Sequence, residues 1–187
     1  MDELIYGVWK GRAYDNRRTI DGKAPEGLPL SEFLAFNSGN PVAGFAGPQG
    51  FLMFDNRVTL ADVLLSYYRR VRELACGRCT PCRAGGVMIV EALEAACEGR
   101  GSEVDWERIR DIALQMKETS LCGIGLTTPE PILGALEHFP ELLVNAPVMP
   151  ATQRDFISVA TAPCIEACPA KVNVPRYIDY IRDGHPE

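Results

Sequence analysis

The sequence predicts a mainly α-helical protein: a small four-helix bundle with irregular, extended arms at its N-terminal and C-terminal ends. Residues 59–145 repeat apolar side chains at the three- and four-residue spacing of amphipathic helices. The residues before and after this segment are instead rich in glycine, proline and polar side chains, which interrupt regular structure. With 187 residues, of which 47% are hydrophobic, the chain is large enough to bury a core.

The first two helices of the bundle are predicted at 59–75 and 82–96. Thr59 can cap the first helix, because a threonine oxygen accepts hydrogen bonds from amides of the first turn. The apolar stripe of this helix comprises Leu60, Val63, Leu64, Tyr67, Val71 and Leu74. Cys97 continues the apolar face of the second helix, and we expect it to be a small core residue.

The third and fourth helices are predicted to begin near Asp105 and at Thr128. Trp106 and Met116 lie on the side of the third helix that we expect to be buried. Thr128 is the expected cap of the fourth helix. Pro129 would take its first helical position, where the missing N–H of proline costs nothing.

Residues 1–58 form the expected N-terminal arm, and residues 146–187 form the C-terminal arm. In the first arm only SEFLAF (31–36) and FLMF (51–54) resemble short regular segments. GNPVAGFAGPQG has neither the G-x-G-x-x-G pattern nor the strand-then-helix context of a dinucleotide site, and it is predicted to be a loop. Such an arm could wrap a partner or be a mobile terminus. The second arm begins with the linker composition APVMPATQ, and Pro175 is expected to open a short last helix.

Composition excludes several classes of function. The formal net charge is −6 and the pI is about 5.1, which argues against nucleic-acid binding because that needs a basic face. There is no run of 18 apolar residues, so no membrane span is expected, and the start MDELIYGVWKGR lacks the apolar core of a signal peptide. We therefore expect a cytoplasmic protein, in which seven cysteines are metal ligands or redox groups rather than disulfides.

Three of the cysteines, Cys76, Cys79 and Cys82, form a C-x2-C-x2-C run in CGRCTPCRAGG. A loop with a thiolate at every third residue can wrap one compact object and reach it from several sides. A cubane iron–sulfur cluster needs four such ligands. A zinc ion also takes four, but zinc sites usually draw paired cysteines from two separate loops. The run therefore favours the cluster, with zinc as the alternative.

Cys122, in TSLCGIG, is the best candidate for the fourth ligand. It follows the third helix, where the chain can return to the start of the second, and the two glycines after it leave room for backbone close to an inorganic core. Cys82 lies at the predicted start of the second helix, whose dipole favours a thiolate. Arg78 and Arg83 add positive charge nearby.

These motifs resemble the C-terminal cluster domain of the flavoprotein subunit of NADH dehydrogenases, a domain that also occurs in NAD-linked hydrogenases and formate dehydrogenases. In that family a further cysteine follows the C-x2-C-x2-C run after about forty residues, and 39 residues separate Cys82 from Cys122 here. The resemblance covers roughly residues 50–145. It implies a four-helix domain that holds a [4Fe–4S] cluster through Cys76, Cys79, Cys82 and Cys122 and takes electrons from a flavin. The family's N-terminal domain for FMN and NADH is missing, so we expect this chain alone to bind no FMN, FAD or NAD.

A further pair, Cys164 and Cys168, lies in CIEACP near the C-terminus. A cysteine shortly before Cys-Pro is typical of the end of a ferredoxin-type ligand run, whose last cysteine can serve another cluster. The segment from Cys164 to Glu187 resembles the N-terminal iron–sulfur region of the glutamate synthase small subunit, which carries two [4Fe–4S] clusters, although that family's other cysteines are absent. Three hypotheses stay open: a second [4Fe–4S] cluster shared with a partner chain, two unligated thiols, or a redox-active pair.

Together these features predict an iron–sulfur electron-transfer subunit of a multisubunit NAD(P)-linked oxidoreductase of the hydrogenase, formate dehydrogenase or electron-bifurcating type. It would relay single electrons between flavin and iron–sulfur partners, and no residue is predicted to be catalytic. The expected partners are flavoprotein subunits and other iron–sulfur subunits. One of the flavoproteins would be an FAD- and NAD(P)H-binding protein that resembles the glutamate synthase small subunit. The alternative is a zinc-stabilised structural or adaptor module that uses the same four cysteines.

Overall fold

The computed structural model describes residues 4–17, 42–150 and 157–159. Its regular structure is mostly helical, which confirms the predicted mainly α class. The four longer helices are α2 (Leu60–Leu74), α3 (Thr80–Cys97), α4 (Trp106–Thr119) and α6 (Glu130–His138). Three short helical segments join or follow them: η1 (Gly101–Glu103), α5 (Gly123–Thr127) and α7 (Glu141–Val144). The longer helices pack in the order α2, α3, α4 and α6, each against the next. Helix α2 also packs against the sheet.

Two of the helix starts lie where the sequence placed them. Thr59 caps α2 with a capping box: its hydroxyl oxygen accepts from the Asp62 N–H at 3.1 Å, and the Asp62 carboxylate accepts from the Thr59 N–H at 3.3 Å. Asp105 caps α4, because its carboxylate accepts from the Arg108 N–H at 3.0 Å. Both boundaries follow from short polar side chains placed just before an apolar stripe.

The prediction that Thr128 caps the fourth helix is wrong. Thr128 has helical dihedral angles because α5 runs directly into it, whereas an N-cap residue needs an extended backbone. Pro129 takes the N-cap position of α6 instead, without a side-chain hydrogen bond. The second helix also differs slightly from its prediction: α3 begins at Thr80, two residues earlier than expected.

A five-stranded sheet replaces much of the irregular structure expected for the N-terminal arm. Its strands are β1 (Tyr6–Trp9), β2 (Arg12–Asp15), β3 (Gly44–Gly47), β4 (Gly50–Met53) and β5 (Ile157–Val159). Their order is β2-β1-β4-β3-β5, and only the β3–β5 pair is parallel. The prediction that GNPVAGFAGPQG forms a loop is therefore wrong, because this segment supplies β3, a tight turn and the start of β4. Lys10 and Gly11 both have positive φ and form the turn of the β1–β2 hairpin.

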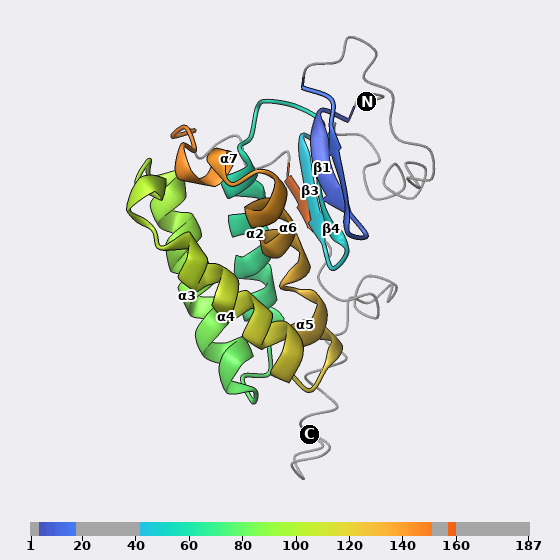
Figure 1. Cartoon of the computed structure of the whole chain (residues 1–187), viewed down its shortest axis with the longest axis vertical. Helices are drawn as coiled ribbons and strands as arrows, with labels where there is room; N and C mark the ends of the chain where they lie inside the picture. The colour runs from blue at the N-terminus through green and yellow to red at the C-terminus, as the bar shows by residue number, and fades with distance from the viewer. Residues whose placement is uncertain (1–3, 18–41, 151–156, 160–187) are drawn as a thin grey trace.

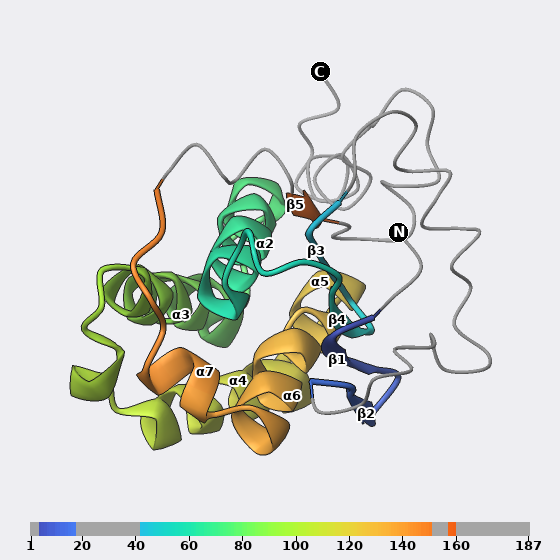
Figure 2. The same cartoon turned by 90° about the horizontal axis from the view of Figure 1, so that it is seen from above.

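The sheet packs on the helices through unusually close approaches. In Figures 1 and 2 the strands lie on one side of the molecule with α2 and α6 beside them, and α3 and α4 lie further away. A Cβ atom at Gly44 of β3 would lie 2.4 Å from Val63 Cγ2 of α2. One at Gly134 of α6 would lie 2.9 Å from Val8 Cγ1 of β1. Glycine at these two positions lets strand and helix backbones meet around one continuous hydrophobic core.

Some expectations lie outside the described residues: the regular segment at 31–36, the helix from Pro175, and the pair Cys164 and Cys168. The division of the chain at residues 58 and 145 stays a prediction. Among the helices that the structure describes, none is both long and apolar enough to cross a membrane.

Candidate metal centre

The loop between α2 and α3 carries the first three cysteines. Cys76 is exposed, Cys79 is the N-cap residue of α3, and Cys82 lies half-buried in the first turn of that helix. Gly77 has a φ of 81°, a left-handed conformation that glycine adopts at little cost. Arg83 donates from Nη1 to the Gly77 carbonyl at 3.1 Å. This bond ties the loop back to the helix and fixes the path of the chain between the cysteines.

Cys122 lies between α4 and α5, where it is the N-cap residue of α5. The N–H of the preceding residue, Leu121, donates to Cys79 Sγ at 3.4 Å, a contact between positions 42 residues apart. A Cβ atom at Gly125 would lie 3.6 Å from Cys82 Cβ, so α5 also packs against the start of α3. The two cysteine-bearing segments therefore meet, as the sequence predicted. That their thiols bind one metal group stays a prediction.

The four thiols affect one another electrostatically. Burial, followed by the three neighbouring cysteines, raises the pKa of the Cys82 thiol to about 11. In the metal-free chain, desolvation therefore outweighs the favourable effect of the helix dipole on the Cys82 thiolate. A bound metal would supply positive charge that favours the deprotonated form of such a thiol.

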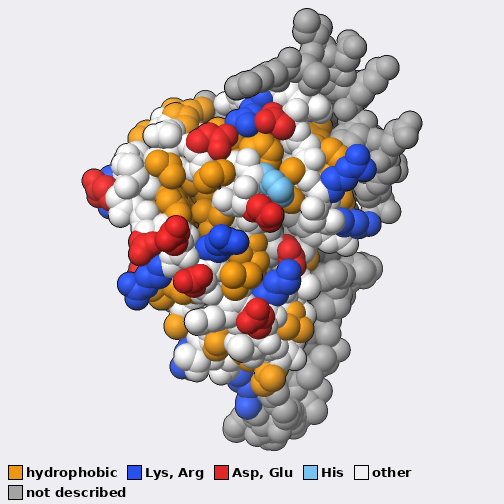
Figure 3. Space-filling model, viewed as in Figure 1, with side chains coloured by type: hydrophobic (Ala, Val, Ile, Leu, Met, Phe, Trp, Pro, Cys, Tyr) orange, Lys and Arg blue, Asp and Glu red, His pale blue; other side chains and the backbone are white. Residues whose placement is uncertain are grey.

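The charged residues within the two cysteine-bearing segments are both arginines. Residues 75–86 and 120–129, which carry the four thiols, contain Arg78 and Arg83 but no aspartate or glutamate, although the chain as a whole has 25 acidic and 19 basic residues and both kinds are visible on the face drawn in Figure 3. Such surroundings favour a group with net negative charge.

Within the part of the chain that the structure describes, no three His, Cys, Asp or Glu side chains are placed as the ligands of a metal ion. The structure thus brings the two cysteine-bearing segments together without placing their thiols as a formed ligand set. The Ser120 hydroxyl is buried beside α5 and has no hydrogen-bond partner among the described residues. A sulfur-rich group would offer this hydroxyl an acceptor.

Cys97 lies at the far end of α3 from the other thiols. At 1.5 Å per residue, the fifteen positions between Cys82 and Cys97 correspond to about 22 Å along the helix axis. Cys97 is partly buried and packs against the hydrophobic core, which confirms its predicted role as a small core residue. It is therefore a useful internal control for the ligand assignment.

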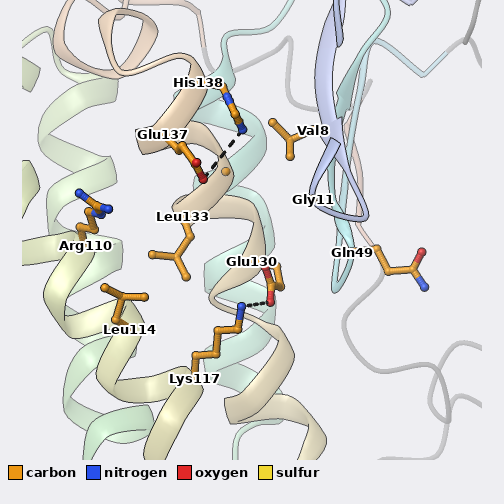
Figure 4. Close-up of a pocket in the computed structure, with 11 residues that line it drawn as sticks. Val8, Gly11, Gln49, Arg110, Leu114, Lys117, Glu130, Leu133, Glu137 and His138 are labelled. Atoms are coloured by element: carbon orange, nitrogen blue, oxygen red, sulfur yellow. Dashed lines mark ion pairs between the residues drawn. The ribbon is translucent and has the colours of Figure 1, made fainter. Parts of the chain in front are cut away.

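A pocket of about 180 Å³ lies between α4, α6 and the turns of the two hairpins (Figure 4). No cysteine is among its described lining residues. One ion pair spans it from α4 to α6, with Lys117 Nζ 2.6 Å from Glu130 Oε1, and within α6 His138 Nε2 lies 3.9 Å from Glu137 Oε2. This pocket shows no pairing of a nucleophile with a base, so we place the candidate site at the cysteines.

A helical domain that gathers cysteines from two loops at one end belongs to the class of cysteine-ligated metal-binding domains. Residues 62–146 match the family described as the NADH-ubiquinone oxidoreductase-F iron–sulfur binding region. This match confirms the resemblance found in the cysteine motifs and supports an iron–sulfur cluster in this region.

Several curated proteins are similar to the chain. The NADPH-Fe(3+) oxidoreductase subunit beta of Geobacter sulfurreducens is 28% identical over 98% of this chain and 27% of its own length. The NADP(+)-dependent formate dehydrogenase subunit beta of Moorella thermoacetica is 28% identical over 100% of this chain and 31% of its own length. The NADP-reducing hydrogenase subunit HndC of Solidesulfovibrio fructosivorans is 32% identical over 74% and 30%. The chain thus spans less than a third of the length of these relatives.

Proposed function

We propose that Cys76, Cys79, Cys82 and Cys122 hold one [4Fe–4S] cluster and that the chain relays single electrons as a subunit of an NAD(P)-linked oxidoreductase. The observation that carries this proposal is the contact between the two cysteine segments inside the matched domain. The Leu121 N–H reaches Cys79 Sγ, so the residue before Cys122 already touches the C-x2-C-x2-C loop. Four thiols and no other metal-binding side chain lie in these segments, and this donor set suits an iron–sulfur cluster.

When bound, the cluster supplies one-electron redox chemistry. The chain's own residues hold and shield it. Cys82 and Cys122 pack against the hydrophobic core, which fixes their positions, while Cys76 is exposed. Leu121, with 82% of its surface exposed, lies beside Cys122 and offers an apolar contact at the same edge. A partner that exchanges electrons would approach from this exposed side.

The host complex is inferred from the relatives. Those compared above are named as subunits of an Fe(3+) oxidoreductase, a formate dehydrogenase and a hydrogenase, all linked to NADP(H). We infer that this chain is a subunit of a complex of this kind. We propose that it works beside flavoprotein and iron–sulfur subunits, in the cytoplasm, without binding FMN, FAD or NAD itself. A flavoprotein similar to the glutamate synthase small subunit is the proposed neighbour of the C-terminal segment. There Cys164 and Cys168 would complete a second [4Fe–4S] cluster together with ligands from that partner.

The proposal is tested on the chain purified without oxygen. We expect a brown protein with broad visible absorption that bleaches on reduction with dithionite. A colourless protein with one zinc per chain would instead support the structural or adaptor function. About eight irons per isolated chain would overturn the shared second cluster, because no partner ligands would then be needed.

Two cysteine variants test the ligand assignment. Cys79→Ser is expected to lose iron and to lower the thermal midpoint, because the free energy of ligation is also free energy of folding. Cys97→Ser is the matched control on the same helix: it should keep its iron and cost only packing. Equal iron loss in both variants would contradict the assignment.

A further inference from the structure

Ser120 ends α4 and immediately precedes the segment that carries Cys122. Its N–H donates to the Met116 carbonyl at 3.1 Å, and its backbone is extended beyond the helix. Only 7% of its surface is exposed, and its Oγ atom is buried without a hydrogen-bond partner in the part of the chain that the structure describes. The N–H of this serine therefore has a hydrogen-bond partner, but its hydroxyl has none among the described residues.

The hydroxyl lies in the wall of the cysteine site. A Cβ atom at Gly125 would lie 2.3 Å from both Cβ and Oγ of Ser120, and the same position lies 3.6 Å from Cys82 Cβ. Ser120 and Cys82 therefore flank the same face of α5. The next residue along the chain, Leu121, donates its N–H to Cys79 Sγ, and Cys122 follows it. The residues that follow Ser120 thus contact Cys79 and include Cys122, and Cys82 lies beside the same glycine of α5 as Ser120 does.

A buried hydroxyl without a partner is costly, because it has lost its bonds to water and gained none in return. Folded proteins leave few such groups, so each one calls for an explanation. Alanine would fill nearly the same volume at Ser120 without this cost. Both the inorganic sulfides of a cluster and the thiolates that hold it are acceptors, and they would occupy the space that the cysteines surround.

We propose that the Ser120 hydroxyl donates a hydrogen bond to a sulfur atom of the bound cluster or of its cysteine ligands and thereby raises the reduction potential. The inference rests on the proposed function and extends it to a residue that is not a ligand. A hydrogen bond to sulfur favours the reduced state, which carries more negative charge on its sulfurs, and such bonds are among the factors that set cluster potentials. Ser120 is thus a residue that tunes the site, not a ligand.

The test is a redox titration of the cluster-loaded chain, followed by electron paramagnetic resonance, for the wild type, Ser120→Ala and Ser120→Thr. We expect Ser120→Ala to lower the midpoint potential by up to 59 mV, which is about a tenfold change in the ratio of reduced to oxidised protein for a one-electron couple. Ser120→Thr keeps the donor and should stay closer to the wild type. In D₂O, pulsed resonance spectra should lose one exchangeable deuteron coupling in Ser120→Ala alone.

Tyr67→Phe is the matched control. It removes another hydroxyl that is buried without a partner among the described residues, but from the core of α2. Its potential should equal that of the wild type. An unchanged potential in Ser120→Ala would overturn the inference, as would an equal shift in Tyr67→Phe. If Ser120→Ala held no cluster, retention of iron by Ser120→Thr would support the need for the hydroxyl, and its loss there too would refute it.

Failure of this inference and failure of the proposed function give different results. If the wild-type chain binds zinc or no metal, the proposed function fails before any variant is compared. If the wild type holds a [4Fe–4S] cluster whose potential does not depend on the Ser120 hydroxyl, the function stands and only the tuning role is lost.

Discussion

Gly85 lies in α3 where it faces two side chains of α4, and a single methyl group there should separate the two helices. A Cβ atom at Gly85 would lie 2.7 Å from Ile112 Cγ2 and 2.8 Å from Met116 Sδ, well inside the optimal separation of about 3.5–4.0 Å. Met116 is flexible and can move aside, but Ile112 is β-branched and restricted at χ1. Such overpacking costs about 1–3 kcal/mol, and the better helix propensity of alanine offsets about 0.5–1 kcal/mol of it.

Gly86→Ala is the matched control one residue further along α3. Its Cβ atom would meet Arg72 Cγ at 3.6 Å, an ordinary contact, so this variant gains the propensity without the clash. We expect the two variants to differ by about 1–3 kcal/mol in the free energy of unfolding. At about 2–4 °C per kcal/mol for a chain of this size, melting curves followed by circular dichroism resolve that difference.

The Gly85→Ala and Gly86→Ala variants also test how the α3–α4 contact affects the metal centre. Met116 is one turn before Ser120 and the Cys122 segment, so separation of α3 from α4 should move Cys122 away from Cys82 and lower the iron content of Gly85→Ala. If Gly85→Ala were stabilised as much as Gly86→Ala and kept all its iron, the close α3–α4 contact described here would be refuted.

Three further predictions concern the helical core. Thr59→Ala removes one half of the α2 capping box, and urea denaturation should show a loss of about 1–2 kcal/mol; an unchanged midpoint would contradict the cap. Tyr68→Phe removes the 2.7 Å hydrogen bond from its hydroxyl to the Thr128 carbonyl and should cost about 1–2 kcal/mol, whereas Tyr67→Phe should be neutral or stabilising. Equal losses of stability in Tyr68→Phe and Tyr67→Phe would contradict the assignment of this hydrogen bond to Tyr68. Burial raises the pKa of Tyr67 and Tyr68 above the ordinary value of about 10. Their neutral forms therefore contribute stability that is fully present below pH 10 and is lost as the pH rises further, and melts at pH 8 and pH 11 should show a smaller alkaline loss in the double phenylalanine variant than in the wild type.

The helices were predictable because their signals are local. The apolar stripe of α2 and the Thr59 cap lie within a few residues of each other, and so do Asp105 and the start of α4. The prediction that Thr128 is an N-cap residue was wrong because a threonine before a proline also fits a residue that continues a preceding short helix. The presence of α5 decides between the two, and five residues carry too little periodicity to predict it.

The sheet was missed for the opposite reason. Gly44, Gly47 and Gly50 are typical of turns, and glycine is depleted in strands. Here Gly44 is a strand residue because α2 approaches it closely, and β1 and β5, which pair with this hairpin, are distant in the sequence. A turn signal could have indicated the first hairpin, since Lys10-Gly11 separates two short segments of matching length.

The candidate site was predictable in its cysteines but not in its environment. The C-x2-C-x2-C spacing is a local pattern, and Cys122 follows from a known family arrangement. That burial raises the pKa of Cys82, and that the Ser120 hydroxyl has no partner beside α5, depend on which side chains surround each atom. No spacing rule carries that information, because the neighbours come from helices far apart in the sequence.

The central claim is that thiols from two separate segments hold a single cluster. It is tested most directly by counting iron, acid-labile sulfide and zinc in the wild-type chain and in Cys122→Ala, both purified without oxygen. The account predicts about four irons and four sulfides in the wild type, as a cubane requires, and loss of the intact cluster in the variant. One zinc in place of iron in the wild type would contradict the account. So would a Cys122→Ala variant that keeps all four irons and four sulfides.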